Sequence, residues 1–544
     1  MPFMMTDTDY ATIETSSPPI SGLAPYTGAW GNDQVVHLLK RTMFGATKAD
    51  VDHFAALTLT ATITELLTTS TPAQLPLNNY SGNANYPDVN AALGQTWVNA
   101  AYDGNLVGVR RNSLKAWWIG LMINQTRSIQ EKMVLFWHNH FATDTNNFDP
   151  TLAYVHYVTL RQYALGNFKA FVKAITLDPH MLYFLNGRNS IKGSPDENYG
   201  REVQELFTIG KNVDGTTPYT EADVKAAARL LTGYQVDYNA RKGIFTPTRH
   251  DSTDKQFSAF YGNKLIAGRT LTDGAKELDD FIDMLFATPN TASYICRKIY
   301  RFFVYYDVTP DVETNVIQPL ALILKNNNFE IKPVLQALFS SQHFFDTANY
   351  GVVIKPPLDL LIGMMREFNV VFPDATNYLP QYGMWFYLFN VGSTISQSLG
   401  EPPNVAGWPA YYQTPVFHEI WVNTDTLPKR LAFTDNMIAS GYSTLSQKII
   451  IDVVAFTQSM PTPADPNLLI SDVLAHLYRV PVQPDFITGL KSILLSNQVS
   501  DHYWTDAWTA YLANPTDKTN LNIVTTRLKS FYKYLLDQME YQLQ

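Results

Sequence analysis

Residues 220–233, "TEADVKAAARLLTG", contain the signals that begin, continue and end an α-helix. Thr220 is a typical N-cap residue, Asp223 stands three residues later in the position of a capping-box acid, and Gly233 follows as a stop signal. The alanines between these signals have a high helix propensity. Because similar signals recur along the chain, we predict a mainly α-helical protein.

Helical patterns of the same kind lie on both sides of this stretch. Upstream, "SPDENYGREVQELFTIG" predicts a helix that begins near Asp196 and ends at Gly210. The only convincing β pattern is a hairpin in residues 234–248, "YQVDYNARKGIFTPT". Further helices are expected at roughly 276–288, 291–304, 312–325, 331–342, 355–369, 428–440, 446–458, 467–477, 484–495, 503–512 and 519–541.

These elements predict a large multi-helix fold in a single chain, with long ordered loops and a minor β-hairpin. We expect an extended N-terminal lead in residues 1–30, an α-helical core domain that carries the polar site in residues 31–430, and a C-terminal helical segment packed on the core in residues 431–544. Long loops rich in Trp, Tyr, His and Pro are expected near a functional site, at about 73–95, 186–200, 239–265 and 396–428.

The composition narrows the class of protein. Of the 544 residues, 46% are hydrophobic and 16% are charged, as expected of a folded protein with a large core. The net charge of −9 gives no reason to expect a nucleic-acid partner. The single cysteine, Cys296, excludes an intramolecular disulfide and a cysteine-based zinc site. No signal peptide is recognisable, and no transmembrane segment is expected.

Residues 128–144, "SIQEKMVLFWHNHFATD", place two histidines in an aromatic run. On a helix Glu131, Leu135 and His138 share one stripe, whereas His138 and His140 point about 160° apart. The two histidines could share a metal ion only if the helix ended or distorted there. The alternative is a hydrogen-bonded pair that supports aromatic packing.

A second polar block, "ENYGREVQELFTIG", contains Arg201, Glu202 and Glu205. Glu202 and Glu205 are one helical turn apart, a spacing that suits a metal site or an acid–base pair. Arg201 and Glu205 are also four residues apart, so they could instead neutralise each other.

A third polar block, "TPTRHDSTDK", contains His250 and Asp251 after the predicted hairpin. A histidine beside a carboxylate suits metal ligation or a general base with its orienting acid. The alternative is an ordinary solvated loop.

The loop "GEPPNVAGWPAYY", residues 400–412, is made rigid by its prolines and presents aromatic side chains. It could form the floor of a binding pocket or a packed structural turn. Phosphate-binding GxxxxGK[ST], GxGxxG, HExxH and GxSxG motifs are missing from the sequence. The candidate substrate-binding residues are aromatic: Trp137, Trp408, Tyr411 and Tyr412.

Seven blocks together resemble a large bacterial family known as domain of unknown function 1800. They are "HLLKRTMFGATKADV", "EKMVLFWHNHFAT", "ENYGREVQELFTIG", "YTEADVKAAARLLTGY", "RHDSTDK", "PPNVAGWP" and the terminal "EYQLQ". The resemblance runs from about residue 34 to the end of the chain. It assigns no catalytic residue. This chain departs from the family pattern in "LGEPPNV", where a glutamine and an aromatic-containing spacer are expected before the prolines.

The resemblance also implies a cellular setting. Members are typically bacterial, often carry export signals and are often encoded beside a second exported family. It therefore implies a periplasmic or extracellular location and a partner protein from that second family.

Two functional hypotheses follow from these patterns. The first is an enzyme with a polar or metal centre, hydrolytic or oxidative, whose substrate could be a polysaccharide. Its metal would be zinc, manganese, iron or copper. The second is a non-catalytic cell-envelope protein that binds or assembles with a partner. The catalytic candidates are Arg201, Glu202, Glu205, His250 and Asp251, and the candidate metal ligands are His138 and His140 with Glu202, Glu205 and His250.

Overall fold

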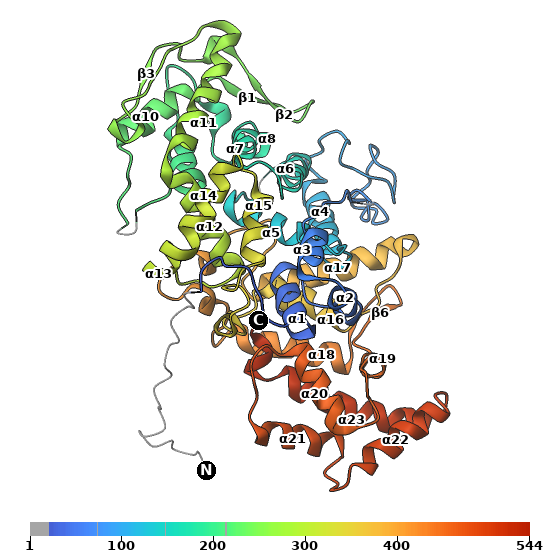
Figure 1. Ribbon diagram of the computed structural model, residues 1–544. Helices are drawn as coiled ribbons and strands as arrows, with labels where there is room; N and C mark the ends of the chain where they lie inside the picture. Colours follow the sequence, from blue (N-terminus) through green and yellow to red (C-terminus); the bar gives the residue numbers. More distant parts are fainter. Residues whose placement is uncertain (1–20, 73, 147, 213–214) are drawn as a thin grey trace.

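The computed structural model describes residues 21–72, 74–146, 148–212 and 215–544, and it is mainly α-helical (Figure 1). Up to residue 287 the helices are α1 (Asn32–Thr42), α2 (Lys48–Ala55), α3 (Leu59–Leu66), α4 (Val107–Ile123), α5 (Gln130–His140), α6 (Pro150–Gln162), α7 (Phe168–Thr176), α8 (Pro179–Phe184), α9 (Glu197–Glu202), α10 (Glu221–Leu230) and α11 (Glu277–Ala287). After residue 287 they are α12 (Pro289–Phe303), α13 (Pro310–Val312), α14 (Gln318–Asn326), α15 (Ile331–Phe339), α16 (Pro357–Glu367), α17 (Tyr378–Thr394), α18 (Thr426–Ala439), α19 (Val453–Gln458), α20 (Pro466–Leu477), α21 (Pro484–Leu494), α22 (His502–Ala513) and α23 (Lys518–Leu536).

Strands are short and form small antiparallel hairpins. In the described part of the chain, β1 (Tyr234–Asp237) pairs with β2 (Lys242–Phe245), β3 (Lys255–Gln256) with β4 (Leu265–Ile266), and β5 (Tyr442–Thr444) with β6 (Gln447–Ile449). Two helices continue as π-helices, η2 (Val203–Thr208) after α9 and η6 (Glu313–Ile317) after α13.

The helix predicted at residue 220 is confirmed. Thr220 caps α10 by accepting a hydrogen bond from the Asp223 amide, and the Asp223 carboxylate accepts one from the Thr220 amide. Gly233 then adopts a φ of +94°, which a residue with a Cβ rarely adopts. The prediction of one helix over residues 446–458 is wrong, since β6 occupies its first part and α19 begins only at Val453.

The middle of the molecule is built from helices that cross close to one another. In Figure 1 the β1–β2 hairpin lies at one end with α10 and α11, and α20–α23 lie at the other. Between them α4 packs along α17 and contacts α16. This contact is close: a Cβ on Gly120 of α4 would lie 2.7 Å from the Trp385 ring of α17.

The C-terminal segment is tied to the core at both of its ends. The predicted boundary after residue 430 falls inside α18, so the segment begins within a helix. At the far end Leu543 pairs with Ile354 in an isolated β-bridge, and the Lys355 amide donates to the Gln542 carbonyl over 2.7 Å. Residues 21–30 of the N-terminal lead lie within the described residues, and the rest of the lead lies outside them.

Candidate active site

His138 and His140 leave α5 in different directions. His138 Nε2 accepts a hydrogen bond from the Gly400 amide over 3.2 Å, and the His138 ring contacts the Trp408 ring at 5.5 Å between centroids. His140 Nε2 donates to the Phe207 carbonyl in η2 over 3.1 Å. Because α5 stays helical through both residues, the two rings bind different segments and are not placed to share a metal ion.

The surroundings of His138 hold other histidines. His138, His156 and His180 line a closed cavity of about 10 Å³, which is close to the size of one water molecule. Burial, together with the nearby His156 and His180, lowers the pKa of His138 well below its usual value. Since the Gly400 amide donates to Nε2, Nδ1 carries the proton of the neutral His138 ring, and neither nitrogen offers a free lone pair. No group of three or more His, Cys, Asp or Glu side chains within the described ranges is placed to hold a metal ion.

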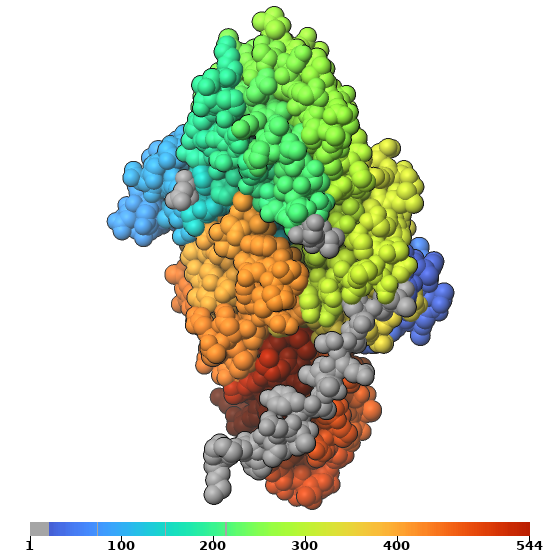
Figure 2. Space-filling view, turned by 90° about the vertical axis from the view of Figure 1, so that its left-hand side faces the viewer, coloured from blue at the N-terminus to red at the C-terminus, as the bar shows by residue number. Residues whose placement is uncertain are grey.

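The residue between the two histidines fixes the proline-rich loop. The Trp408 amide donates to Asn139 Oδ1 over 2.8 Å. Gly407, with a φ of +93°, approaches so closely that a Cβ on it would lie 2.3 Å from that oxygen. Figure 2 shows the loop segment around residues 396–428 (orange) at the surface, directly below the region around residues 200–250 (green). The C-terminal end of α5 therefore joins this loop to η2.

The second polar block lies at the start of η2 and is partly exposed. Arg201 pairs with Glu221 through two hydrogen bonds of 2.7 and 2.8 Å, rather than with Glu205. Glu205 pairs with Lys211 at 2.8 Å. Burial, and secondly the Glu205 carboxylate, raises the pKa of Glu202. The block meets α5 through η2, whose Phe207 carbonyl accepts a hydrogen bond from His140.

The third polar block belongs to a separate buried network. His250 Nδ1 donates to the Thr232 carbonyl over 3.0 Å, and Nε2 lies 3.1 Å from Glu277 Oε1. Glu277 also pairs with the buried Lys255. Asp251 accepts from Arg229; although burial acts to raise the pKa of Asp251, this bond lowers it below its usual value. The structure does not bring His250 or Asp251 to the two histidines of α5.

The predicted aromatic residues are mostly inside the protein. Trp137 is buried and donates to the Ala164 carbonyl over 2.9 Å, and Trp408 is buried against His138. Tyr411 stacks on Phe302 with 5.0 Å between ring centroids. Tyr412, 37% exposed, is the one of the four that a large ligand could reach from solvent.

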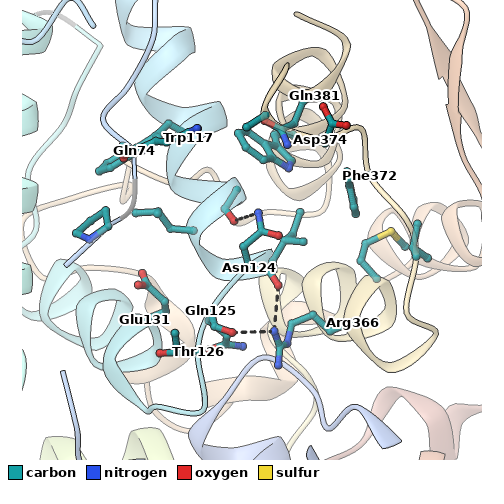
Figure 3. A pocket seen from close by; sticks show the side chains of 18 of the residues that line it. Gln74, Trp117, Asn124, Gln125, Thr126, Glu131, Arg366, Phe372, Asp374 and Gln381 are labelled. Atoms are coloured by element: carbon teal, nitrogen blue, oxygen red, sulfur yellow. Dashed lines mark hydrogen bonds between the residues drawn. The ribbon is translucent and has the colours of Figure 1, made fainter. Parts of the chain in front are cut away.

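The opposite end of α5 borders a larger space. A cavity of about 640 Å³ lies between α4, α5, α6, α16 and α17 (Figure 3). Trp117 from α4 and Trp385 from α17 form part of its wall, and Trp117 donates to the Gln74 carbonyl over 2.8 Å. Five amide side chains face the same cavity: Gln74, Asn124, Gln125, Asn369 and Gln381.

Glu131, in the first turn of α5, is the buried acid of this cavity. Its Oε1 pairs with Arg161 Nη1, whereas its Oε2 has no hydrogen-bond partner among the described residues. Burial raises the pKa of Glu131 by more than Arg161 lowers it. In Figure 3 Glu131 lies on one side of the cavity, with Asp374 and Gln381 across from it. Because burial raises its pKa, the Glu131 carboxyl group holds its proton to a higher pH than an exposed glutamate does.

Arg161 of α6 holds Glu131 in place. It reaches the Ser70 carbonyl over 3.0 Å and the Tyr157 hydroxyl over 3.2 Å, besides pairing with Glu131. The second arginine of the cavity, Arg366, donates to the carbonyls of Phe44 and Ile123. Both guanidinium groups are therefore engaged by the protein itself.

Comparison with known proteins identifies a family. The family model described as "Protein of unknown function (DUF1800)" matches residues 37–543. The chain belongs to the DUF1800 family. No curated protein and no solved structure matches it. Across the residues described for this DUF1800 protein, no helix is both long and apolar enough to span a membrane.

The residues of the larger cavity were not among the predicted site residues of this DUF1800 chain. Glu131 was predicted to share one helical stripe with Leu135 and His138, and all three are buried residues of α5. An acid in such an apolar, aromatic run is a signal for a buried carboxyl group. Nothing in the sequence indicated that α4 and α17 would leave a cavity in front of that acid.

Proposed function

We propose that this DUF1800 protein is a hydrolase that cleaves an uncharged polysaccharide by acid–base catalysis at Glu131. The observation that carries the proposal is a buried carboxyl group with a raised pKa and one unpartnered oxygen, in the wall of a cavity lined by tryptophans and amides. Perturbed acids in clefts are typical of catalytic sites.

The reaction balances with water as the co-reactant. The Glu131 carboxyl gives its proton to the glycosidic oxygen while the bond from that oxygen to the anomeric carbon breaks. Water then adds to the anomeric carbon and returns a proton to the Glu131 carboxylate. Two shorter chains leave, and Glu131 regains its starting state. Arg161 acts as a positioning residue, because it binds one carboxyl oxygen, while the other oxygen is buried and has no partner among the described residues.

The lining of the cavity supports an uncharged, hydroxylated substrate. Its amide side chains can donate to and accept from hydroxyl groups, and the buried Trp117 and Trp385 contribute apolar atoms to its wall. The cations that line it are each paired with a carboxylate, Arg161 with Glu131 and Arg366 with Asp50, which disfavours an anionic substrate.

Glu131→Gln tests the proposal directly. The release of reducing ends from soluble β-glucan, xylan, starch and glycol chitin is measured for the native chain and for the variant. General acid–base catalysis predicts that the variant loses activity by about 100-fold or more on the substrate that the native chain cleaves. Glu202→Gln is the matched control and should keep full activity. Equal activity of Glu131→Gln and the native chain, or no activity of the native chain on any of the four polymers, would contradict the proposal.

A metal centre of zinc, manganese, iron or copper stays a prediction. Elemental analysis of protein purified without chelator or histidine tag measures it, with His138→Ala as the comparison. About one equivalent of metal that is lost in His138→Ala would support the centre. A metal content that is the same in both proteins would remove His138 from it.

An assembly role with an exported partner protein is the second candidate. It is favoured by the C-terminal end of α5, where His138, Asn139 and His140 are all bound to other segments of the chain rather than open to a ligand. Purification of the chain with the product of a neighbouring gene tests this role. A stable complex that forms equally well with Glu131→Gln would support assembly independently of catalysis.

A further inference from the structure

A second cavity of about 350 Å³ adjoins the first. Both cavities are lined by Trp117 and Arg161 and by the segment Ser70–Pro72, which therefore forms a ridge between them. The second cavity is otherwise lined by Gln130 of α5, by residues of α6, among them Tyr154, Tyr157 and Gln162, and by residues of the chain before α4.

The ridge is fixed beside the proposed catalytic acid. The Ser70 amide donates to Gln130 Oε1 over 2.8 Å, and Arg161 Nη2 donates to the Ser70 carbonyl over 3.0 Å. Gln130 precedes Glu131 in α5, and Arg161 pairs with Glu131. Glu131 thus lies at the boundary between the two cavities rather than at the far end of either.

The chemistry of the second cavity matches that of the first. Its lining combines hydroxyl, amide and aromatic side chains, and the engaged Arg161 is its one charged residue. Tyr154 is partly exposed and packs against Trp117 with 5.9 Å between ring centroids, so aromatic surface continues from one cavity to the other. The same class of ligand fits both spaces.

We infer that the two cavities are the two halves of one groove, which binds a linear, uncharged glycan across the ridge and cuts it internally. The inference rests on the proposed function for the cleavage step alone. Sugar units lie on both sides of Glu131, and the products are oligosaccharides rather than single units removed from a chain end.

The test uses the full chain and three hexamers: cellohexaose, maltohexaose and fully acetylated chitohexaose. Binding is measured by calorimetry with oligomers of two to six units, and products are separated by length. We expect affinity to rise beyond three units, and the first products to be dimers to tetramers. Tyr154→Ala, which removes the shared aromatic surface in the second cavity, should weaken hexamer binding about tenfold and leave dimer binding unchanged. Tyr102→Ala is the matched control and should change neither, since Tyr102 is 65% exposed and lines neither cavity.

The outcomes separate the groove from the catalysis. Single units released from a chain end, or a hexamer affinity that Tyr154→Ala leaves unchanged, would overturn the inference while hydrolysis at Glu131 stood. Length-dependent binding that Tyr154→Ala weakens, without cleavage of any hexamer, would support the groove and count against the proposed hydrolase. Absence of both binding and cleavage with all three series would overturn the two together.

Discussion

The two ends of α5 differ in what surrounds their polar residues. At the N-terminal end, Glu131 faces a cavity of about 640 Å³ and keeps one oxygen without a partner among the described residues. At the C-terminal end, His138, Asn139 and His140 each bind the backbone of another segment. One helix thus carries an acid that lines a cavity and three residues that bind other segments of the chain.

The difference shows that residue type alone does not identify a site. The histidines are more typical of catalysis and metal binding than a lone glutamate is. In this fold Nε2 of each histidine is hydrogen-bonded to the loop or to η2, and Nδ1 of each is buried without a partner among the described residues, as Glu131 Oε2 is. What sets Glu131 apart is that it lines the cavity of about 640 Å³.

Gly407→Ala should have the largest effect on stability at the C-terminal end of α5, which we call the packed end. The Cβ would meet Asn139 Oδ1, and the left-handed φ is itself unfavourable for alanine, so we expect the free energy of unfolding to fall by roughly 2–4 kcal/mol. Urea denaturation measures this change. If folded molecules of the variant keep their activity, the packed end is structural.

Gly262→Ala is the matched control for Gly407→Ala. Gly262 also has a positive φ, of +66°, but a Cβ on it would meet no atom within 4 Å. We expect a loss of about 1 kcal/mol from the backbone alone. Equal losses in the two variants would show that the contact with Asn139 contributes nothing.

The fold was predictable where local signals decide it. The N-cap Thr220 and the glycine stop at Gly233 fix α10 without help from the rest of the chain. Helix α4 begins at Val107 without a side-chain cap and is buried on most of its surface, so it has no apolar stripe to recognise. The β5–β6 turn places Leu445 and Ser446 at positive φ, where the glycine or asparagine of a turn signal would be expected.

The candidate site was predictable only where local geometry determines it. The opposed directions of His138 and His140 follow from helix geometry, and the structure has them so. The cavity beside Glu131 depends on how α4 packs on α17 through Gly120 and Trp385. Neither of these two helices was predicted, so the space between them could not be predicted either.

The histidines near the packed end predict how stability depends on pH. Burial, and next the neighbouring His156, lowers the pKa of His180 to about 3, against about 6.5 in an unfolded chain. Between these values the unfolded chain binds one proton more than the folded protein, so His180 lowers stability as the pH falls from about 6.5 towards 3.

Replacing His180 should remove the contribution that its proton makes to the pH dependence of stability. Between pH 7 and pH 5 the free energy of unfolding should fall by about 2 kcal/mol less in His180→Gln than in the native chain. Urea denaturation at each pH measures this difference. The exposed His502→Gln is the control and should leave the dependence unchanged. The same loss in His180→Gln as in the native chain would mean that His180 binds its proton in the folded protein as readily as in the unfolded chain.

Tyr412→Ala should have the smallest effect on either end of α5. Tyr412 is 37% exposed, and its hydroxyl accepts a hydrogen bond from the exposed Asn404 over 2.9 Å, so little packing is lost with its ring. We expect unfolding free energy to change by less than about 0.5 kcal/mol and activity by less than about twofold. A tenfold loss of activity with unchanged stability would instead indicate that the substrate binds at the proline-rich loop. An exposed ring that contributes nothing to the fold would then contribute to binding.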